Sequence, residues 1–346
     1  MQIFGPAADA LNTLTPSQID FLERTPKAEL HAHLNGSIPL PLLQELAAEH
    51  LSAPGAQEDP AIRAALEALR AGPALAEIHD FFHLFPAIYA LTSTPRALAR
   101  AADAVLAAFL GGARPQCAYL ELRTTPRATP AMDRAAYLAT VLSALERYAP
   151  AQAGLIVSLD RRMGAEALEE CVALACALRA QGRRVVGVDL CGDPLAGDMA
   201  LLGPYLARVQ AAGLGVTLHI AETTENTPEE TLQLLSYGPQ RLGHATFLDA
   251  EAIALVLEKK MCIEICLSSN ILCKTVSSLE SHHISQYLTC DHPVSICTDD
   301  ILPFRTSLIG EYALLLAAKP LGLGLSEAQV ARIAAMSMSH RFSQEL

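Results

Sequence analysis

Residues 155–190 read LIVSLDRRMGAEALEECVALACALRAQGRRVVGVDL. This stretch opens with an apolar run at 155–160 and closes with a second one at 185–190, both rich in Val, Ile and Leu, as buried strands are. Between the two runs, residues 164–182 place apolar side chains at helical spacing and have a glycine at each end. A strand, a helix and another strand in this order predict two parallel strands joined by a crossover helix.

The same alternation continues along the whole chain. Six more runs have strand character, at residues 28–33, 117–123, 216–220, 241–244, 262–267 and 294–298. Eight strand–helix units predict an α/β fold of the (β/α)8 type, a TIM barrel. An open, doubly wound parallel sheet is the competing arrangement.

One segment interrupts the regular alternation. Residues 36–116 separate the first two predicted strands and contain several stretches of helical character. We expect these residues to form a helical insertion that folds over the barrel rim as a lid. No repeat or low-complexity linker marks a second domain, so residues 1–346 are expected to form a single domain.

Composition narrows the classes of partner. The net charge of −12 and the pI near 5.4 argue against binding to a nucleic-acid backbone. Every apolar run is broken well before the roughly 18 residues that a membrane-spanning helix needs. The first residues lack the basic and apolar regions of a signal peptide, and nine cysteines scattered through apolar segments fit reduced thiols. We therefore expect a cytoplasmic monomer that binds neither nucleic acid nor a membrane.

Histidines and acidic residues gather at the ends of four predicted strands. Such residues close the first, fifth, sixth and eighth runs: His31, His33, His219, Glu222, His244, Asp299 and Asp300. In a parallel barrel the carboxyl ends of all strands share one rim, where the active sites of this fold lie. A single histidine on an apolar strand is usually a satisfied core residue, but that explanation does not account for seven such residues at one rim.

The first of these clusters has the geometry of a metal site. His31 and His33 stand two residues apart, so both rings project from the same face of the strand and can reach one cation. His219 and Asp299 from other strands would complete a set of three nitrogens and one carboxylate. This set suits Zn²⁺ with a position left open for water, although iron or another transition ion is chemically allowed.

Four ordered motifs carry a resemblance to a known family. The chain contains ELHAHLNGS at 29–37, HIAE at 219–222, RLGHATFLD at 241–249 and CTDD at 297–300. In this order and on these strand ends they resemble the adenosine deaminase branch of the amidohydrolase superfamily. The intervening YLELRTTPR, SLDRR, GVDLCGDP and HHISQYL…HPVSICTDD are more similar to its adenosine deaminase-like group, the N6-methyl-AMP deaminases, than to the nucleoside enzymes.

The resemblance implies a role for each of these side chains. One zinc ion per subunit would be held by His31, His33, His219 and Asp299. Glu222 would protonate N1 of the purine while water attacks C6, and His244 would orient and deprotonate that water. Asp300 would bond near N7, and the backbone N–H of Gly192 would reach N3. Asp160 is expected either to contact the substrate or to form a structural ion pair, and His282 and His283 to lie behind the site or at the surface.

Asn35 bears on the choice of substrate. The nucleoside enzymes typically have an aspartate at this position, which accepts hydrogen bonds from the 5′ end of the ribose. A carboxylate about 4 Å from a phosphate would cost roughly 4 kcal/mol per unit charge at an effective dielectric near 20, and asparagine removes that repulsion. The competing interpretation is that Asn35 only stabilises a turn before Gly36. Further phosphate contacts are expected from the hydroxyls of Thr92, Ser93 and Thr94.

The expected activity is therefore a zinc-dependent hydrolytic deamination of a purine nucleoside monophosphate, in which N6-methyl-AMP and water give IMP and methylamine. The alternative is an adenosine deaminase that acts on the nucleoside. Two departures from the nucleoside enzymes, Ala221 in HIAE instead of HAGE and Ala245 where glycine is common after the histidine, leave every catalytic group in place. Three other protein classes do not fit the sequence. A binuclear amidohydrolase would usually have a lysine at the end of the fourth strand, and a cytidine deaminase would have a Pro-Cys-x-x-Cys motif; both are absent. A homologue that only binds its ligand would have lost a metal ligand or Glu222, and this chain keeps them all.

Overall fold

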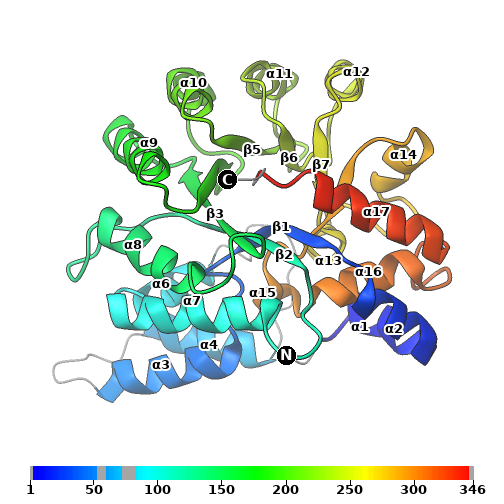
Figure 1. The fold of residues 1–346 in the computed structure, drawn as a ribbon, viewed down its shortest axis with the longest axis horizontal. Coiled ribbons are helices and arrows are strands. Elements are labelled where there is room, and N and C mark those ends of the chain that lie inside the picture. Colours follow the sequence, from blue (N-terminus) through cyan, green and yellow to red (C-terminus); the bar gives the residue numbers. More distant parts are fainter. Residues whose placement is uncertain (1–2, 53–59, 72–82, 343–346) are drawn as a thin grey trace.

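Eight parallel strands form the centre of the molecule in a computed structural model that describes residues 3–52, 60–71 and 83–342. The strands pair in chain order in one sheet, each with its successor. Figure 1 shows them at the centre with helices arranged around them. Their bounds are β1 Ala28–His33, β2 Tyr119–Thr124, β3 Ala153–Asp160, β4 Val185–Cys191, β5 Gly215–Ile220, β6 Arg241–His244, β7 Cys262–Ile265 and β8 Val294–Ile296.

The sheet closes on itself between its first and last strands. Asp299, just beyond β8, forms a parallel bridge with Ala32 of β1. The Asp299 N–H donates to the carbonyl of His31 at 2.8 Å, and the His33 N–H donates to the carbonyl of Asp299 at 3.0 Å. The predicted (β/α)8 barrel is therefore confirmed, and the open doubly wound sheet is not the fold of this chain.

Helices follow the strands around the barrel. They are α1 Pro6–Thr13, α2 Pro16–Arg24, α3 Leu40–Ser52, α4 Pro60–Ala71, α6 Phe85–Leu91, α7 Pro95–Leu110, α8 Arg134–Leu145, α9 Ala165–Ala180, the 3-10 helix η1 Met199–Leu202, α10 Gly203–Ala211, α11 Pro228–Ser236, α12 Ala250–Lys259, α13 Leu267–Leu272, α14 Ile284–Thr289, α15 Ile301–Phe304, α16 Leu308–Leu316 and α17 Glu327–Ser339. None of the helices in the described ranges is long and apolar enough to cross a lipid bilayer.

All eight predicted strands form, and two of them, residues 28–33 and 241–244, have the predicted ends. The other six differ at one or both ends, and one difference changes the type of element: the strand expected at 262–267 ends at Ile265, and Leu267 already begins α13. Both segments are apolar and buried, so the change from strand to helix leaves no trace in the hydrophobic pattern.

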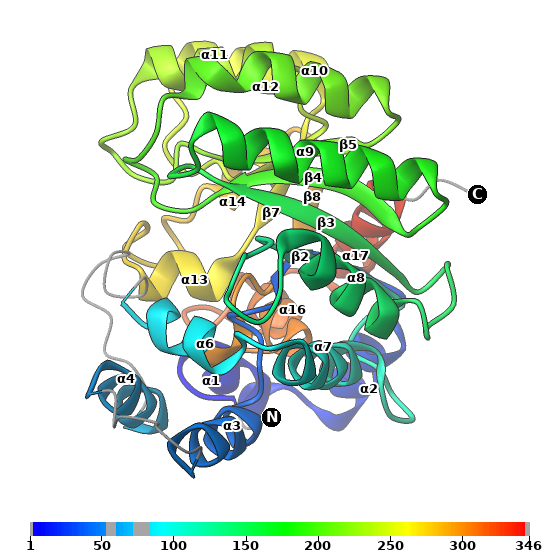
Figure 2. The same ribbon diagram turned by 90° about the vertical axis from the view of Figure 1, so that its left-hand side faces the viewer.

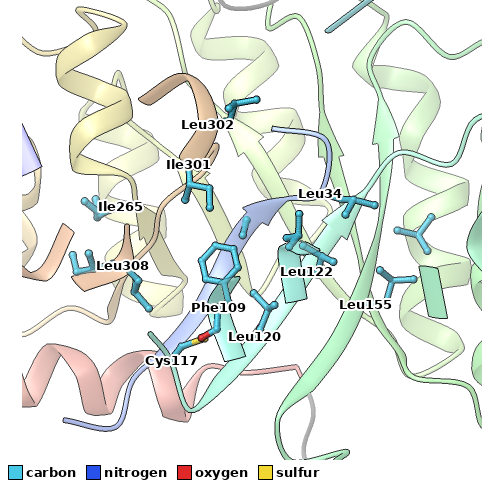
Figure 3. Packing of buried hydrophobic residues seen from close by; sticks show 14 of the residues in the cluster. Leu34, Phe109, Cys117, Leu120, Leu122, Leu155, Ile265, Ile301, Leu302 and Leu308 are labelled. Carbon is cyan, nitrogen blue, oxygen red and sulfur yellow. The ribbon is translucent and has the colours of Figure 1, made fainter. Parts of the chain in front are cut away.

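The insertion between β1 and β2 contains α3, α4, α6 and α7 in its described part. Of these, α7 packs on the barrel wall: Phe109 lies in one apolar cluster with Leu120 and Leu122 of β2 and Leu308 of α16 (Figure 3). The helix α6 instead places Phe85, Pro86 and Tyr89 along a cavity at the carboxyl-terminal rim of the barrel. A lid role for the insertion, and the single-domain assignment, stay predictions.

The opposite end of the barrel is covered by the last described residue. The ring of Phe342 lies against the backbones of Gly187 in β4 and Gly215 in β5, where any larger residue would overlap the ring. Its N–H donates to Glu121 Oε1 at 2.6 Å, and the Arg241 guanidinium stacks 3.6 Å from the ring centroid. Figure 2 shows α17, the last helix before Phe342, on the side away from α6 and α13.

Candidate active site

A cavity of about 540 Å³ opens at the carboxyl end of the barrel. Residues at or just after the end of every strand line it, which is where a parallel barrel brings distant chain segments together. They include His33, Asn35, Asp160, Gly192, His219, Glu222, His244, Asp299 and Asp300. The structure thus gathers the sequence-predicted residues of four strands at one place.

Four of the lining and adjoining side chains converge like metal ligands. The Nε2 atom of His33 lies 3.3 Å from that of His31 and 3.2 Å from that of His219. Asp299 Oδ1 is 3.5 Å from the Nε2 atoms of both His31 and His33. A tetrahedral ion with zinc–nitrogen bonds of about 2.0–2.1 Å separates its ligand atoms by about 3.3–3.4 Å. The donor spacing therefore fits such an ion.

Two of these histidines are held in the tautomer that a metal needs. His31 Nδ1 lies 2.7 Å from Glu264 Oε2, and His219 Nδ1 lies 2.8 Å from the carbonyl of Leu190 and 3.0 Å from Asp189 Oδ1. Each Nδ1 carries the hydrogen toward its acceptor, so each Nε2 lone pair faces the shared centre. Such outer partners orient metal-binding histidines and raise their basicity.

Glu264 of β7 is the centre of a buried ion network that the sequence analysis missed. Its carboxylate accepts from Arg123 Nη2 at 2.8 Å, from Arg241 Nε at 2.7 Å and from Thr217 Oγ1 at 2.9 Å, besides contacting His31. Burial alone would raise the pKa of Glu264, but the two arginines outweigh it and hold that pKa well below its ordinary value. Glu264 stays ionised and fixes the His31 ring. The sequence feature that could have identified Glu264 is its position as a charged residue in the middle of an apolar strand.

Glu222 and His244 lie beside the ligand cluster. His244 Nε2 is 3.6 Å from Glu222 Oε1 and 3.8 Å from Asp299 Oδ2. Burial raises the pKa of Glu222 to about 7, which keeps a proton available on a carboxyl group near neutral pH. Burial lowers the pKa of His244 to about 3, so its ring is neutral and able to accept a proton. An acid and a base thus face the same side of the cluster.

Asp300 is buried beside its neighbour Asp299, and its Oδ1 has no hydrogen-bond partner among the described residues. Burial, followed by the charge of Asp299, raises the pKa of Asp300 well above its ordinary value. A protonated Asp300 can donate a hydrogen bond into the cavity. Space for its carboxyl group exists because residue 36 is glycine: a Cβ there would overlap the Asp300 carboxylate.

Replacing Gly36 with alanine is expected to lower kcat/KM by about 100-fold, since a displacement of about 1 Å in a catalytic group has an effect of that order. The measurement is steady-state kinetics on the purified variant with its metal content checked. Ser37→Ala in the same turn is the matched control, because it removes only a buried hydroxyl without a partner among the described residues. Unchanged kcat/KM in Gly36→Ala would show that Asp300 is not needed where the structure places it.

Gly192 follows β4 with a φ of 100°, a conformation that side chains rarely adopt. A Cβ at this position would lie 2.9 Å from Cγ of Asp160, so glycine lets the loop approach the end of β3. Asp160 Oδ1 accepts the backbone N–H of Arg162 at 2.8 Å. Asp160 is thus fixed by its own loop, and both residues line the cavity, as expected of substrate contacts.

Asn35 lies in a turn and also faces the cavity. The Ser37 N–H donates to the Leu34 carbonyl at 3.2 Å, so Asn35 and Gly36 occupy the middle of the turn. The Asn35 side chain accepts from the Tyr137 hydroxyl at 3.3 Å and donates to Thr92 Oγ1 at 3.4 Å. The turn that was the competing interpretation is therefore present, and the side chain has a second role in the cavity wall.

The hydroxyls of residues 92–94 are engaged elsewhere. Thr92 Oγ1 donates to the carbonyl of Ile88, Ser93 Oγ donates to the carbonyl of Ala90, and Thr94 caps the N-terminus of α7. None of the three is among the residues that line the cavity in the described part of the chain. The expected phosphate contacts at 92–94 have no support from this geometry, because local backbone groups use these hydroxyls.

Besides Arg123 of the Glu264 network, three arginines line the cavity: Arg127, Arg134 and Arg162. Carboxylates hold two of them, Glu170 at 2.6 Å from Arg134 and Asp193 at 2.6 Å from Arg162. The guanidinium of Arg127 lies 3.6 Å from the ring centroid of Tyr89 on α6. Arg127 belongs to the YLELRTTPR motif, and that membership could have identified it as a candidate site residue.

The site can now be compared with known proteins. The family model described as adenosine deaminase matches residues 26–345. The chain belongs to the adenosine deaminase family. The predicted membership is thereby confirmed, and with it membership of the hydrolytic deaminases that act on C–N bonds.

Curated adenosine deaminase family members of similar length match almost the whole chain. They include the N6-mAMP deaminase of Arabidopsis thaliana, 32% identical over 94% of this chain and 95% of its own length. The N6-Methyl-AMP deaminase of Homo sapiens is 32% identical over 95% of this chain and 92% of its own length. A crystal structure from Arabidopsis complexed with IMP is 31% identical, covers 94% of each chain and superposes with a TM-score of 0.82. The adenine deaminase of Arthrobacter aurescens, 21% identical with a TM-score of 0.77, shares the fold.

Proposed function

We propose that this protein is a zinc-dependent deaminase that converts N6-methyl-AMP and water to IMP and methylamine. The observation that carries the proposal is the meeting of the His31, His33, His219 and Asp299 donor set with Glu222 and His244 at one cavity. The substrate class follows relatives named N6-methyl-AMP deaminase and a related structure complexed with IMP.

The donor set favours zinc among the metals. Three imidazole nitrogens and one carboxylate suit Zn²⁺ with one further position open, as in catalytic zinc sites. When bound, such an ion supplies an activated water at neutral pH. Metal analysis of the protein purified without added metal tests the assignment, and about one zinc per chain is expected.

Each of three side chains then has its own part in the reaction: Glu222 and His244 each transfer a proton, and Asp300 donates a hydrogen bond. The carboxyl group of Glu222 donates to N1 of the purine as water adds to C6, and neutral His244 takes the proton from the attacking water. Protonated Asp300 donates to N7, which only accepts hydrogen bonds. The amine leaves C6 with a proton, so water replaces the amino substituent and no oxidant or reductant is needed.

A nucleotide rather than a nucleoside fits the charges of the cavity wall. The chain carries a net charge of −12, yet four arginines line this cavity. Arg127 stacks on Tyr89 and is thereby held at the cavity wall, where its donors suit a phosphate. Neutral Asn35 adds no negative charge. Arg127 and Asn35 are the phosphate contacts we propose.

The direct test is an assay of the purified protein on N6-methyl-AMP, AMP, N6-methyladenosine and adenosine under one set of conditions. The highest kcat/KM is expected for N6-methyl-AMP, with release of methylamine in equal amount to IMP. A preference for adenosine would overturn the nucleotide assignment and leave an adenosine deaminase. The expected cytoplasmic location and monomeric state stay predictions.

Asn35→Asp is expected to raise KM for N6-methyl-AMP at least tenfold, while KM for N6-methyladenosine does not rise. A new carboxylate about 4 Å from a phosphate costs up to roughly 4 kcal/mol at an effective dielectric near 20, and solvent in the open cavity reduces this. Asn12→Asp in α1 introduces the same charge at an exposed position and serves as the control. If the ratio of the two KM values does not change, Asn35 serves only the turn.

A further inference from the structure

Two adjacent histidines, His282 and His283, stand just before α14 and outside the residues that line the cavity. His282 is buried, and His283 is half-buried. His283 Nε2 lies 2.9 Å from the carbonyl oxygen of His244, the proposed catalytic base. A carbonyl only accepts, so His283 carries its hydrogen on Nε2 and donates it to the backbone of His244.

His282 reaches the same loop by a second route. Its Nδ1 accepts the backbone N–H of Ile284 at 3.1 Å, so its Nε2 carries the hydrogen and donates to Asn270 Oδ1 at 3.2 Å. The Asn270 amide then donates to Thr246 Oγ1 at 3.3 Å. The two imidazole rings stack with centroids 4.4 Å apart. The loop after β6 is thus held at two points, the carbonyl of His244 and the hydroxyl of Thr246.

This loop has a backbone conformation that needs to be held. His244 and Ala245 have φ angles of 58° and 49°, two consecutive residues in the left-handed region. Residues with a Cβ pay a steric cost there that glycine does not. The conformation turns the His244 ring toward Glu222 and Asp299, with its Nε2 at 3.6 Å and 3.8 Å from their carboxylate oxygens. Relaxation of the loop would carry the ring away from both.

We propose that His283 is a positioning residue for His244, and that the Asn270–His282 pair supports it. Such a positioning residue is needed because the methyl group of Ala245 disfavours the left-handed backbone conformation that directs the His244 ring toward Glu222 and Asp299. The proposal rests on the proposed deaminase function and explains how this chain keeps its base in place without glycine at residue 245. Burial lowers the pKa of His283 to about 4, so the neutral ring adds no charge next to His244 at pH 7.

The test compares four variants with the wild-type protein. His283→Leu removes the hydrogen-bond donor, and His283→Gln keeps one, because its side-chain amide can place an N–H where Nε2 stands. The other two are Ala245→Gly and the double variant His283→Leu/Ala245→Gly. We expect His283→Leu to lower kcat at least tenfold, with KM and bound metal unchanged. His283→Gln should keep most of kcat, and adding Ala245→Gly to His283→Leu should restore kcat at least fivefold.

A merely structural role would change KM, metal content and thermal stability together with kcat. The matched control is Ala221→Gly added to His283→Leu, because Ala221 also has a left-handed φ of 47° but follows β5 and lies outside the loop whose His244 carbonyl accepts from His283. It should not restore kcat. Wild-type kcat in His283→Leu, or equal restoration by glycine at 221 and 245, overturns the proposal.

If His283→Leu fails to fold, the other two single variants still decide the question. A donor role for His283 requires that His283→Gln keeps a kcat near that of the wild-type protein. A strained turn requires that Ala245→Gly does not lower the thermal stability. Failure of either requirement overturns the proposal. If the wild-type protein turns over adenosine and not the nucleotide, the proposed substrate is wrong. The ratios of kcat between variants on adenosine then test the positioning role separately.

Discussion

Glu222→Gln is expected to lower kcat about a thousandfold while leaving metal content and nucleotide affinity close to those of the wild-type protein. The glutamine amide has the same shape as the carboxyl group but cannot transfer a proton to N1, and loss of a general acid typically costs 10²- to 10⁴-fold in rate. The measurements are single-turnover kinetics, metal analysis and equilibrium binding of IMP.

Glu225→Gln is the matched control for this experiment. Glu225 lies three residues further along the same loop and is exposed, so its substitution removes an equal charge without reaching the cavity. It should leave kcat unchanged. Turnover by Glu222→Gln within tenfold of the wild-type rate would assign the proton donor to another group.

Removal of the metal is expected to abolish turnover and to destabilise the fold. Without a cation, the nitrogens of His31, His33 and His219 crowd together at 3.2–3.3 Å beside a buried carboxylate. Binding at a free-metal concentration one thousand times Kd contributes about 4 kcal/mol to the free energy of unfolding. Chelator-treated protein should therefore unfold at lower denaturant concentration, and added zinc should restore both stability and activity.

The double variant His31→Ala/His33→Ala separates the two effects of chelation. It should unfold at the same denaturant concentration with and without zinc, because the site that links the metal to stability is gone. A zinc-dependent shift in this variant would place the stabilising ion elsewhere in the molecule. Wild-type protein that keeps full activity after its metal content has been shown to be negligible would contradict the metal-dependent reaction.

The barrel and its metal cluster were predictable from sequence because both follow from short-range patterns. Strands buried on both faces appear as apolar runs, and histidines and acidic residues cluster where several of these runs end at the rim. His31, His219 and His244 stand at such strand ends, so the topology alone brings them together. Asn35, which the resemblance to the deaminase family marked as a substrate contact, also lines the cavity.

The phosphate contacts were not predictable in the same way. The sequence suggested that the Thr94 hydroxyl is available to a ligand, but it caps the N-terminus of α7. The Thr92 hydroxyl accepts a hydrogen bond from the Asn35 side chain. Arg127 reaches the cavity by stacking on Tyr89, which is separated from it by the whole of α7 and β2. Such contacts depend on the path of the insertion, and hydrophobic periodicity does not encode that path.

Backbone conformation was the other feature that the sequence did not reveal. Ala221 and Ala245 were noted as substitutions for glycine that leave the catalytic groups intact. The structure shows that both occupy left-handed positions, at φ angles of 47° and 49°. Only the fold shows that a methyl group at these positions has a steric cost.

The closure of the sheet between β1 and β8 also bears on how the protein is made. His31 and His33 are translated more than 200 residues before Asp299, which bridges to Ala32. The proposed four-ligand site therefore cannot form on a nascent chain until the last strand of the barrel, β8, has been translated. A chain interrupted before residue 299 would have the three histidines but neither the seam nor the carboxylate, so the proposed metal site would be incomplete in it.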